Sequence, residues 1–194
     1  GLASSRTALV ADSTDPTLAF AGLRGDRFSV DFNPAADRLR VISNNGQNLR
    51  INVDTGATTT DGMLNGLTNT QVTAAAYTNS FAGTVSATAL FDLDSNSSNL
   101  LQQIPPNDGT LVNIGSLGLT LGLNSGFDIA GGDNGLVLAS IADGSANTSS
   151  LYRVNLSTAA TTPAISVNGS ANLQASKIGN SSTPAIIDIA IWLK

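Results

Sequence analysis

Four segments of this chain begin alike, and the distance between them is the feature that most constrains the fold. Asp31, Ala76, Asp128 and Asp188 hold equivalent places in these segments and lie 45, 52 and 60 residues apart. The residues between them form short alternating apolar runs separated by Gly, Asn, Asp and Pro, with almost no helical periodicity. A repeat of about this length, made of short strands, predicts the four-stranded blades of a β-propeller.

The runs inside each repeat predict a four-stranded antiparallel meander. Turn signals such as Asp54-Thr55-Gly56 and Asn107-Asp108-Gly109 separate the runs and favour hairpin connections. In the first unit the strands are expected at 30–33, 38–43, 48–53 and 56–60. In the second unit they are expected at 75–78, 88–93, 100–104 and 110–114, and in the third at 127–130, 136–141, 151–156 and 161–167.

The two ends of the chain are expected to close the ring. The run 186–192 resembles a first strand with nothing after it, whereas 7–11 and 17–21 resemble third and fourth strands. A blade shared by both ends would remove exposed sheet edges. We therefore expect residues 1–194 to form one all-β, propeller-like domain of about four blades, closed by the N- and C-terminal strands. A β-sandwich and a β-solenoid are the alternatives.

The composition excludes most catalytic chemistry. The chain has no cysteine, histidine or glutamate, so thiolate nucleophiles, imidazole bases and the commonest transition-metal ligands are missing. A serine nucleophile would have only Lys177, Lys194 or an aspartate as its base. The net charge of −5 argues against nucleic acid as a partner, and the absence of an 18-residue apolar run argues against membrane insertion. We expect no enzyme activity, no cofactor and no metal requirement, and the start at Gly1 favours a processed chain.

Repeated aspartates are the first candidate site. In a closed ring Asp31, Asp128 and Asp188 would converge on the axis, where they could bind a cation or a polar ligand. The alternative, which we favour, is that each carboxylate accepts hydrogen bonds from backbone N–H groups near the start of its own or the next blade. We expect the three residues to be structural.

Two further polar clusters have a functional and a structural interpretation. Asp92-Leu93-Asp94-Ser95-Asn96 places oxygen atoms at alternating positions, as calcium loops do, but it lacks their glycine and distant glutamate, which favours a plain turn. An arginine cluster could recognise a carboxylate or sulfate, or could form ion pairs across adjacent strands, which is the simpler interpretation. Its members are Arg38, Arg40 and Arg50, with Asp37 and Asp54 beside them.

Five Asn-x-Ser/Thr sequons are a third feature with two interpretations. They would be glycosylation sites in a eukaryotic secretory route, and turn residues in a bacterial chain. They begin at Asn96, Asn147, Asn155, Asn168 and Asn180.

A series of motifs between residues 22 and 160 points to a known family. They are Val30-Asp31-Phe32-Asn33-Pro34-Ala35-Ala36-Asp37-Arg38-Leu39-Arg40-Val41, Gly46-Gln47-Asn48-Leu49-Arg50, Asp54-Thr55-Gly56-Ala57, Val72-Thr73-Ala74-Ala75-Ala76-Tyr77-Thr78-Asn79, Pro105-Pro106-Asn107-Asp108-Gly109-Thr110-Leu111 and Gly126-Phe127-Asp128-Ile129. The series resembles a secreted bacterial family known as domain of unknown function 4394. The resemblance implies a propeller-like fold and an extracellular location. It implies no activity for particular residues.

Two functions from different classes remain. The first is a non-enzymatic extracellular structural or adhesive protein that associates with itself into a filament, matrix or surface layer, through its terminal strands and blade edges. The second is a monomeric secreted module that binds glycans or another surface ligand. Glycan sites usually present aromatic rings, and only 5% of the residues here are aromatic, so the sequence favours self-association.

Overall fold

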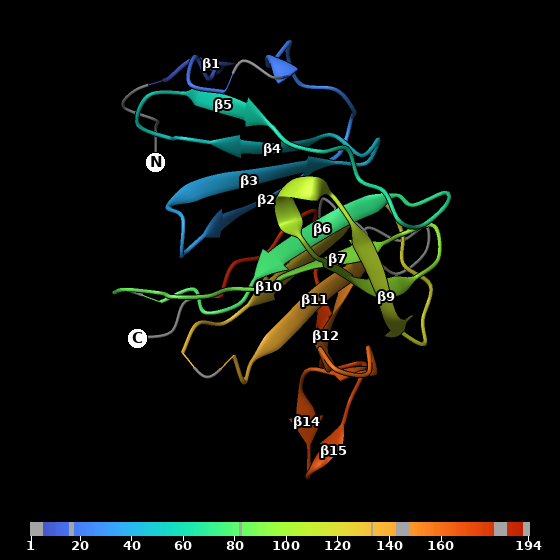
Figure 1. The fold of residues 1–194 in the computed structure, drawn as a ribbon. Helices are drawn as coiled ribbons and strands as arrows, with labels where there is room; N and C mark the ends of the chain where they lie inside the picture. The colour runs from blue at the N-terminus through green and yellow to red at the C-terminus, as the bar shows by residue number, and fades with distance from the viewer. Residues whose placement is uncertain are drawn as a thin grey trace.

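The computed structural model describes residues 6–15, 18–81, 83–132, 134–142, 148–180 and 186–191. Its strands form three main sheets, each containing a four-stranded antiparallel meander in chain order (Figure 1). The first sheet contains β1 (Val10–Ala11), β2 (Phe28–Asn33), β3 (Arg38–Ser43), β4 (Asn48–Ile51) and β5 (Ala57–Thr60), in the order β1-β5-β4-β3-β2. The second contains β6 (Val72–Tyr77), β7 (Leu90–Asp94), β8 (Asn99–Gln103) and β9 (Leu111–Ser116).

The third sheet contains β10 (Ser125–Ile129), β11 (Val137–Ala142), β12 (Ser149–Val154) and β13 (Thr161–Pro163), and β16 (Lys177–Ile178) also pairs with β12. A separate two-stranded hairpin is formed by β14 (Ser166–Val167) and β15 (Ser170–Ala171). A short 3-10 turn at Pro106–Asp108 connects β8 to β9. None of the sheets formed by the described residues closes into a barrel. Among those residues, no helix has the length and hydrophobicity needed to cross a membrane.

The structure confirms the all-β class and the three predicted meanders. β3 has the predicted bounds, and the other strands shift by a few residues. The predicted strand at 161–167 is instead divided, because β13 ends at Pro163 and β14 begins at Ser166 in another sheet. Proline has no N–H to donate to a strand ladder, so it commonly ends a strand or sits at a sheet edge.

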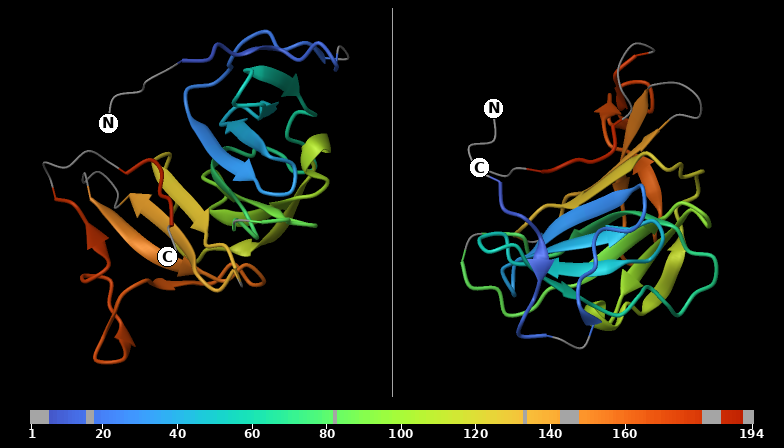
Figure 2. Two further views of the ribbon diagram at one scale, coloured as in Figure 1. Left: turned by 90° about the vertical axis from the view of Figure 1, so that its left-hand side faces the viewer. Right: turned by 90° about the horizontal axis from the view of Figure 1, so that it is seen from above.

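The opening strands of the three meanders lie side by side, with β6 between β2 and β10. Side-chain hydroxyls join them: Ala75 N–H donates to Ser29 Oγ at 2.6 Å, and the hydroxyls of Thr73 and Ser125 are 2.8 Å apart. The sheets therefore spread from a shared set of inner strands, as Figure 2 shows from two directions.

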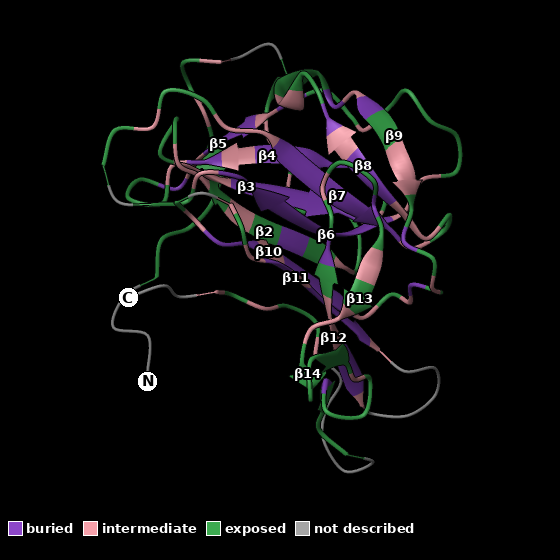
Figure 3. Cartoon of the chain, turned by 90° about the horizontal axis from the view of Figure 1, so that it is seen from below, coloured by how far each residue is buried: buried purple, intermediate pink, exposed green. Residues whose placement is uncertain are grey.

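Two hydrophobic cores fill the spaces between the sheets. One lies between the second and third sheets and includes Leu93 and Phe127, and the other lies between the first and second sheets and includes Ile42 and Leu90. The second sheet is thus covered on both faces, and every residue of β6 is buried (Figure 3). A strand buried on both faces carries a continuous run of apolar or small residues, as β6 does.

The N-terminal segment corrects the predicted ring closure, because it does not share a sheet with the C-terminal run. β1 pairs in parallel with β5, and Ala19 forms an antiparallel bridge with Thr59. Val10 N–H donates to the carbonyl oxygen of Gly56 at 3.0 Å. The segment thereby satisfies backbone groups at the outer edge of the first sheet that would otherwise have no partner in it.

The predicted terminal strand 186–192 is also corrected. Residues 186–191, called the C-terminal segment below, form no strand ladder, and Trp192 lies outside the described residues. In Figure 2 the segment, in red, runs beside the strands of the third sheet. It therefore occupies the side of β10 that faces away from β6.

A glycine permits this close approach. An added Cβ on Gly126 of β10 would lie 2.7 Å from Ile189 N and 2.8 Å from Asp188 Cα, where no side chain fits. Ile191 N–H also donates to the carboxylate of Asp128. The C-terminal segment is thus held against β10 of its own chain.

Candidate functional site

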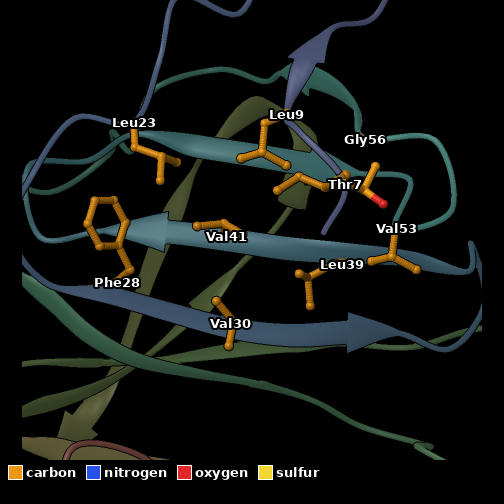
Figure 4. Close-up of a pocket in the computed structure, with 10 residues that line it drawn as sticks. Thr7, Leu9, Leu23, Phe28, Val30, Leu39, Val41, Val53 and Gly56 are labelled. Carbon is orange, nitrogen blue, oxygen red and sulfur yellow. The ribbon is translucent and has the colours of Figure 1, made fainter. Parts of the chain in front are cut away.

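The first sheet has an open apolar groove on the face turned away from the second sheet. The groove has a volume of about 580 Å³, and Phe28, Val30, Leu39 and Val41 line it from β2 and β3 (Figure 4). None of its ten lining residues is charged. Val30 is 44% exposed and Phe28 is 38% exposed, on β2 at the edge of a sheet whose other face is packed. Large apolar side chains left exposed together often mark an interaction surface.

Strand alternation explains why the groove is apolar. Successive side chains of a strand point to opposite faces, so Val30 and Val41 point into the groove while Ser29, Arg40 and Ile42 point toward the second sheet. The first sheet therefore has one apolar face without a neighbouring sheet and one mixed face that is fully engaged.

The N-terminal segment forms one wall of the groove. Thr7 and Leu9 line it, and Leu23 from the loop before β2 lines it as well (Figure 4). Gly56 allows this wall to form, because its φ is +75° and an added Cβ would lie 2.0 Å from the carbonyl oxygen of Ala8. Without this segment the groove would lose the wall that Thr7 and Leu9 form.

A buried ion-pair network fixes the opposite face of the first sheet. Arg40 and Arg50 are directly opposite each other on β3 and β4, and both pair with Asp61, at 2.6 and 2.7 Å. Arg40 is 1% exposed and also donates to Tyr77 Oη and Asn107 Oδ1. The expected ion pairing is therefore found, but its carboxylate is Asp61.

The aspartates expected to supply this pairing lie elsewhere. The carbonyl oxygen of Asp37 accepts from Arg38 Nη1 at 2.7 Å, and Asp54 lies in an exposed turn after β4. Arg40 thus belongs to the packing between two sheets and is inaccessible to an outside anion.

Asp92 and Asp94 occupy different environments. Asp92 is fully buried within β7, and neither carboxylate oxygen has a hydrogen-bond partner. Burial raises the pKa of Asp92 to about 8, and the nearby Arg40 charge opposes this increase. The Asp94 carboxylate accepts from the N–H groups of Gln71 and Asn96, at 2.7 and 3.1 Å, and so caps the turn after β7. Residues 92–96 are thus a strand end and a turn.

The repeated aspartates accept backbone hydrogen bonds. Asp31 accepts from Tyr77 N–H of β6 at 2.6 Å, and Asp128 accepts from Ile191 N–H. Each also accepts from the N–H of the residue that follows it. The predicted bonding to backbone donors of the neighbouring unit is confirmed for these two residues. Asp188, by contrast, accepts from the N–H of Ile189, its own neighbour in the chain.

These bonds revise the alignment of the repeats. Tyr77 follows Ala76, and Ile191 follows Ala190, so the structure matches Ala190 rather than Asp188 with Ala76. Matching the two bonds in this way places the equivalent position two residues after Asp188.

The three carboxylates are nevertheless close enough to influence one another. Burial raises the pKa of Asp31 to about 7, although two backbone hydrogen bonds oppose the increase, and the charges of Asp128 and Asp188 add to it. Burial also raises the pKa values of Asp128 and Asp188. Among the described residues, no three acidic side chains are placed to hold one metal ion.

A comparison with known protein families identifies the family of this chain. A sequence model described as Domain of unknown function (DUF4394) matches residues 4–176, which is most of the 194-residue chain. The chain belongs to the DUF4394 family. No curated protein and no solved structure matched it.

The DUF4394 match contains the whole groove and the β14–β15 hairpin, whereas the C-terminal segment lies beyond it. The match also includes sequons that occupy turns. Asn155 caps the turn after β12 by accepting from Ser157 N–H at 2.9 Å, and Asn168 has a φ of +51° in the β14–β15 turn. Asn96 donates to the Asn69 carbonyl oxygen, while Asn147 lies outside the described residues.

Sequence reasoning missed the groove and Asp61. The alternation of Phe28, Val30 and Phe32 indicates an apolar face, but it does not indicate whether another sheet covers that face. The signal for Asp61 was weaker, because Asp61-Gly62 looks like one of many exposed turns. Only the spatial pairing of β3 with β4 brings two arginines together and creates the need for a buried carboxylate.

Proposed function

We propose that this protein is a non-enzymatic structural protein that acts outside the cell and associates with itself, using the groove of the first sheet as one half of the contact. The observation that carries the proposal is the open apolar face: its side chains are large, adjacent and uncharged, and no other sheet of the described chain covers them. Burying such a face against another molecule is favourable because apolar surface leaves water.

The finer arrangement that we propose is an incomplete propeller ring. β2, β6, β10 and the C-terminal segment are its four inner positions, and the three meanders are its blades. The repeated bonds from Tyr77 to Asp31 and from Ile191 to Asp128 support equivalent positions for β6 and the C-terminal segment. In this ring the groove of the first sheet borders the fourth position, which lacks outer strands among the described residues.

The proposed occupant of the groove is the β14–β15 hairpin of a second copy. The hairpin projects from the third sheet at the end of the molecule away from the first sheet (Figures 1 and 2). Its flanks carry Ile165, Val167 and Leu173, which are 43–45% exposed. No charged residue occurs between Arg153 and Lys177. A projecting apolar hairpin and a hollow apolar groove are complementary in shape and in chemistry, and neither needs a charge to be desolvated.

The location of the two surfaces determines the form of the assembly. Because the groove and the hairpin are different patches at opposite ends, their contact is head-to-tail and leaves one free groove and one free hairpin on every dimer. Such a contact forms an open filament unless its rotation closes a ring.

Two charged substitutions test the contact. Val30→Glu places a carboxylate in the groove, and Val167→Glu places one on the hairpin. Val112→Glu makes the same change at an equally exposed valine of β9 and is the matched control. We expect the wild type and Val112→Glu to form assemblies that grow with concentration in light scattering and electron microscopy. Each of the other two variants should remain monomeric while keeping its circular dichroism spectrum.

Mixing the two blocked variants gives the decisive result. Val30→Glu keeps an intact hairpin and Val167→Glu keeps an intact groove, so an equimolar mixture should form 1:1 heterodimers and nothing longer. A wild type that stays monomeric at all concentrations would overturn the proposed function. A wild type that assembles while the mixture stays monomeric would instead overturn the pairing of hairpin with groove.

A further inference from the structure

A second hollow lies where the inner strands of the three meanders begin. It has a volume of about 440 Å³, within the size range of small-molecule sites. Phe28 of β2, Thr73 of β6, Asn124 just before β10 and Ile187 of the C-terminal segment all line it. Four segments that are far apart in the sequence thus surround one space between them.

The lining combines an apolar wall with hydrogen-bonding groups. Phe28, Leu123 and Ile187 supply the apolar part, and Asp26, Arg27, Thr73 and Asn124 supply the polar part. A ligand that fits must therefore present both an apolar face and several polar groups. Sugars do so, because their ring C–H groups form one face and their hydroxyls surround it.

Arg27 carries an uncompensated positive charge at this site. Its Nη1 donates to the carbonyl oxygen of Asp26 at 2.9 Å, and its Nε is buried without a hydrogen-bond partner, so a ligand would bind through the other guanidinium nitrogen atoms. The ion pairs of the described residues involve only Arg40 and Arg50, so no carboxylate neutralises Arg27. Arginine binds carboxylates through charge-assisted, often bidentate hydrogen bonds, so the missing partner is an anion.

We propose that this hollow binds a sugar that carries a carboxylate, a uronic acid. Arg27 binds the carboxylate, while Asp26 and Asn124 bind ring hydroxyls and Phe28 with Leu123 contacts the apolar face of the ring. A simple inorganic anion would leave the apolar wall unused. A neutral sugar would leave the Arg27 charge without a partner. The site is separate from self-association, although Phe28 lines both hollows, so the test leaves Phe28 unchanged.

The test measures binding of D-glucuronic acid and D-galacturonic acid by saturation-transfer NMR and calorimetry, with D-glucose and inorganic phosphate as comparison probes. Arg27→Gln removes the charge, and Leu123→Trp fills the hollow from a half-exposed position. Arg153→Gln, at an exposed site on β12, is the matched control. Thermal unfolding establishes that each variant is folded.

We expect one of the two uronic acids to bind the wild type, and Arg27→Gln to weaken its binding by about tenfold or more, as expected for the loss of a charge-assisted pair. Leu123→Trp should abolish binding, and Arg153→Gln should leave it unchanged. Equal binding of glucose and the uronic acids would overturn the role of the carboxylate. Equal competition by phosphate would overturn the role of the sugar ring and show a general anion site. No binding of either uronic acid, or binding unaffected by both hollow variants, would overturn the proposal.

Discussion

The buried carboxylate of Asp92 lies in an environment that disfavours a negative charge. It is enclosed between the first and second sheets, and neither of its oxygens has a donor. Gln103 Oε1, on the same face of the neighbouring strand β8, has no partner either. Protonation of Asp92 removes the buried charge and turns one of its oxygens into a donor, so the fold favours the neutral acid.

The first prediction concerns the pH dependence of stability. The folded-state pKa values of Asp92 and Asp31 are raised to about 8 and about 7 from 3.8. Between 3.8 and these values the folded state binds more protons than the unfolded state, so the free energy of unfolding falls as pH rises. Asp92→Asn removes the larger part of this loss. We expect it to raise stability at pH 9 by on the order of 1–3 kcal/mol, measured by urea unfolding.

A matched variant tests whether the loss of one negative charge, without the loss of a buried carboxylate, changes the pH dependence of stability. Asp54→Asn removes one negative charge from an exposed turn and should leave the pH dependence of the wild type unchanged. Parallel pH curves for the wild type and Asp92→Asn would contradict the assignment.

At the scale of elements, the local sequence pattern predicts which neighbouring strands form hairpins. It does not predict which distant segments pack against each other. The meanders were predictable because each hairpin is local, with turn signals such as Asp54-Thr55-Gly56 adjoining the strands that they connect. The positions of the chain ends could not be predicted in this way. The free edge of β5 can pair with a parallel or an antiparallel strand, and the sequence does not indicate which segment of the chain lies beside it. The close packing of Gly126 against the C-terminal segment could not be predicted either, because an alignment of the repeats that matches Asp188 with Ala76 gives no contact between these residues.

The second prediction tests that fit. Gly126→Ala places a methyl group where the backbone of Asp188 and Ile189 lies, so the C-terminal segment must move away from β10. We expect faster amide hydrogen exchange over residues 186–191 and a loss of stability of about 1–3 kcal/mol, the usual range for overpacking. Gly122→Ala is the control, because a Cβ there meets open space. Unchanged exchange in Gly126→Ala would show that the segment is not docked against β10.

At the scale of the whole molecule, the chain combines few charges with one uncovered sheet face. Only 12% of its residues are charged, and the net charge is −5. The groove and the hairpin contribute none of these charges, so repulsion between copies comes from other parts of the surface.

The third prediction concerns salt. Raising NaCl from about 0.05 to 0.5 M screens the repulsion between negatively charged copies and leaves apolar contacts intact. We therefore expect assembly to be maintained or strengthened, and sulfate to strengthen it further by favouring apolar burial. Sedimentation at matched protein concentration measures this directly. Dissolution of the assemblies at high NaCl would mean that ion pairs, and not the groove, hold the copies together.

The charge-free hairpin has one more consequence, for the cleavage of the protein by proteases. Projecting loops are where proteolytic nicking concentrates. Trypsin-like proteases cut after lysine or arginine, and the chain has neither between Arg153 and Lys177. The most prominent projection of the molecule is therefore closed to that whole class of protease, whether or not it is covered by another copy.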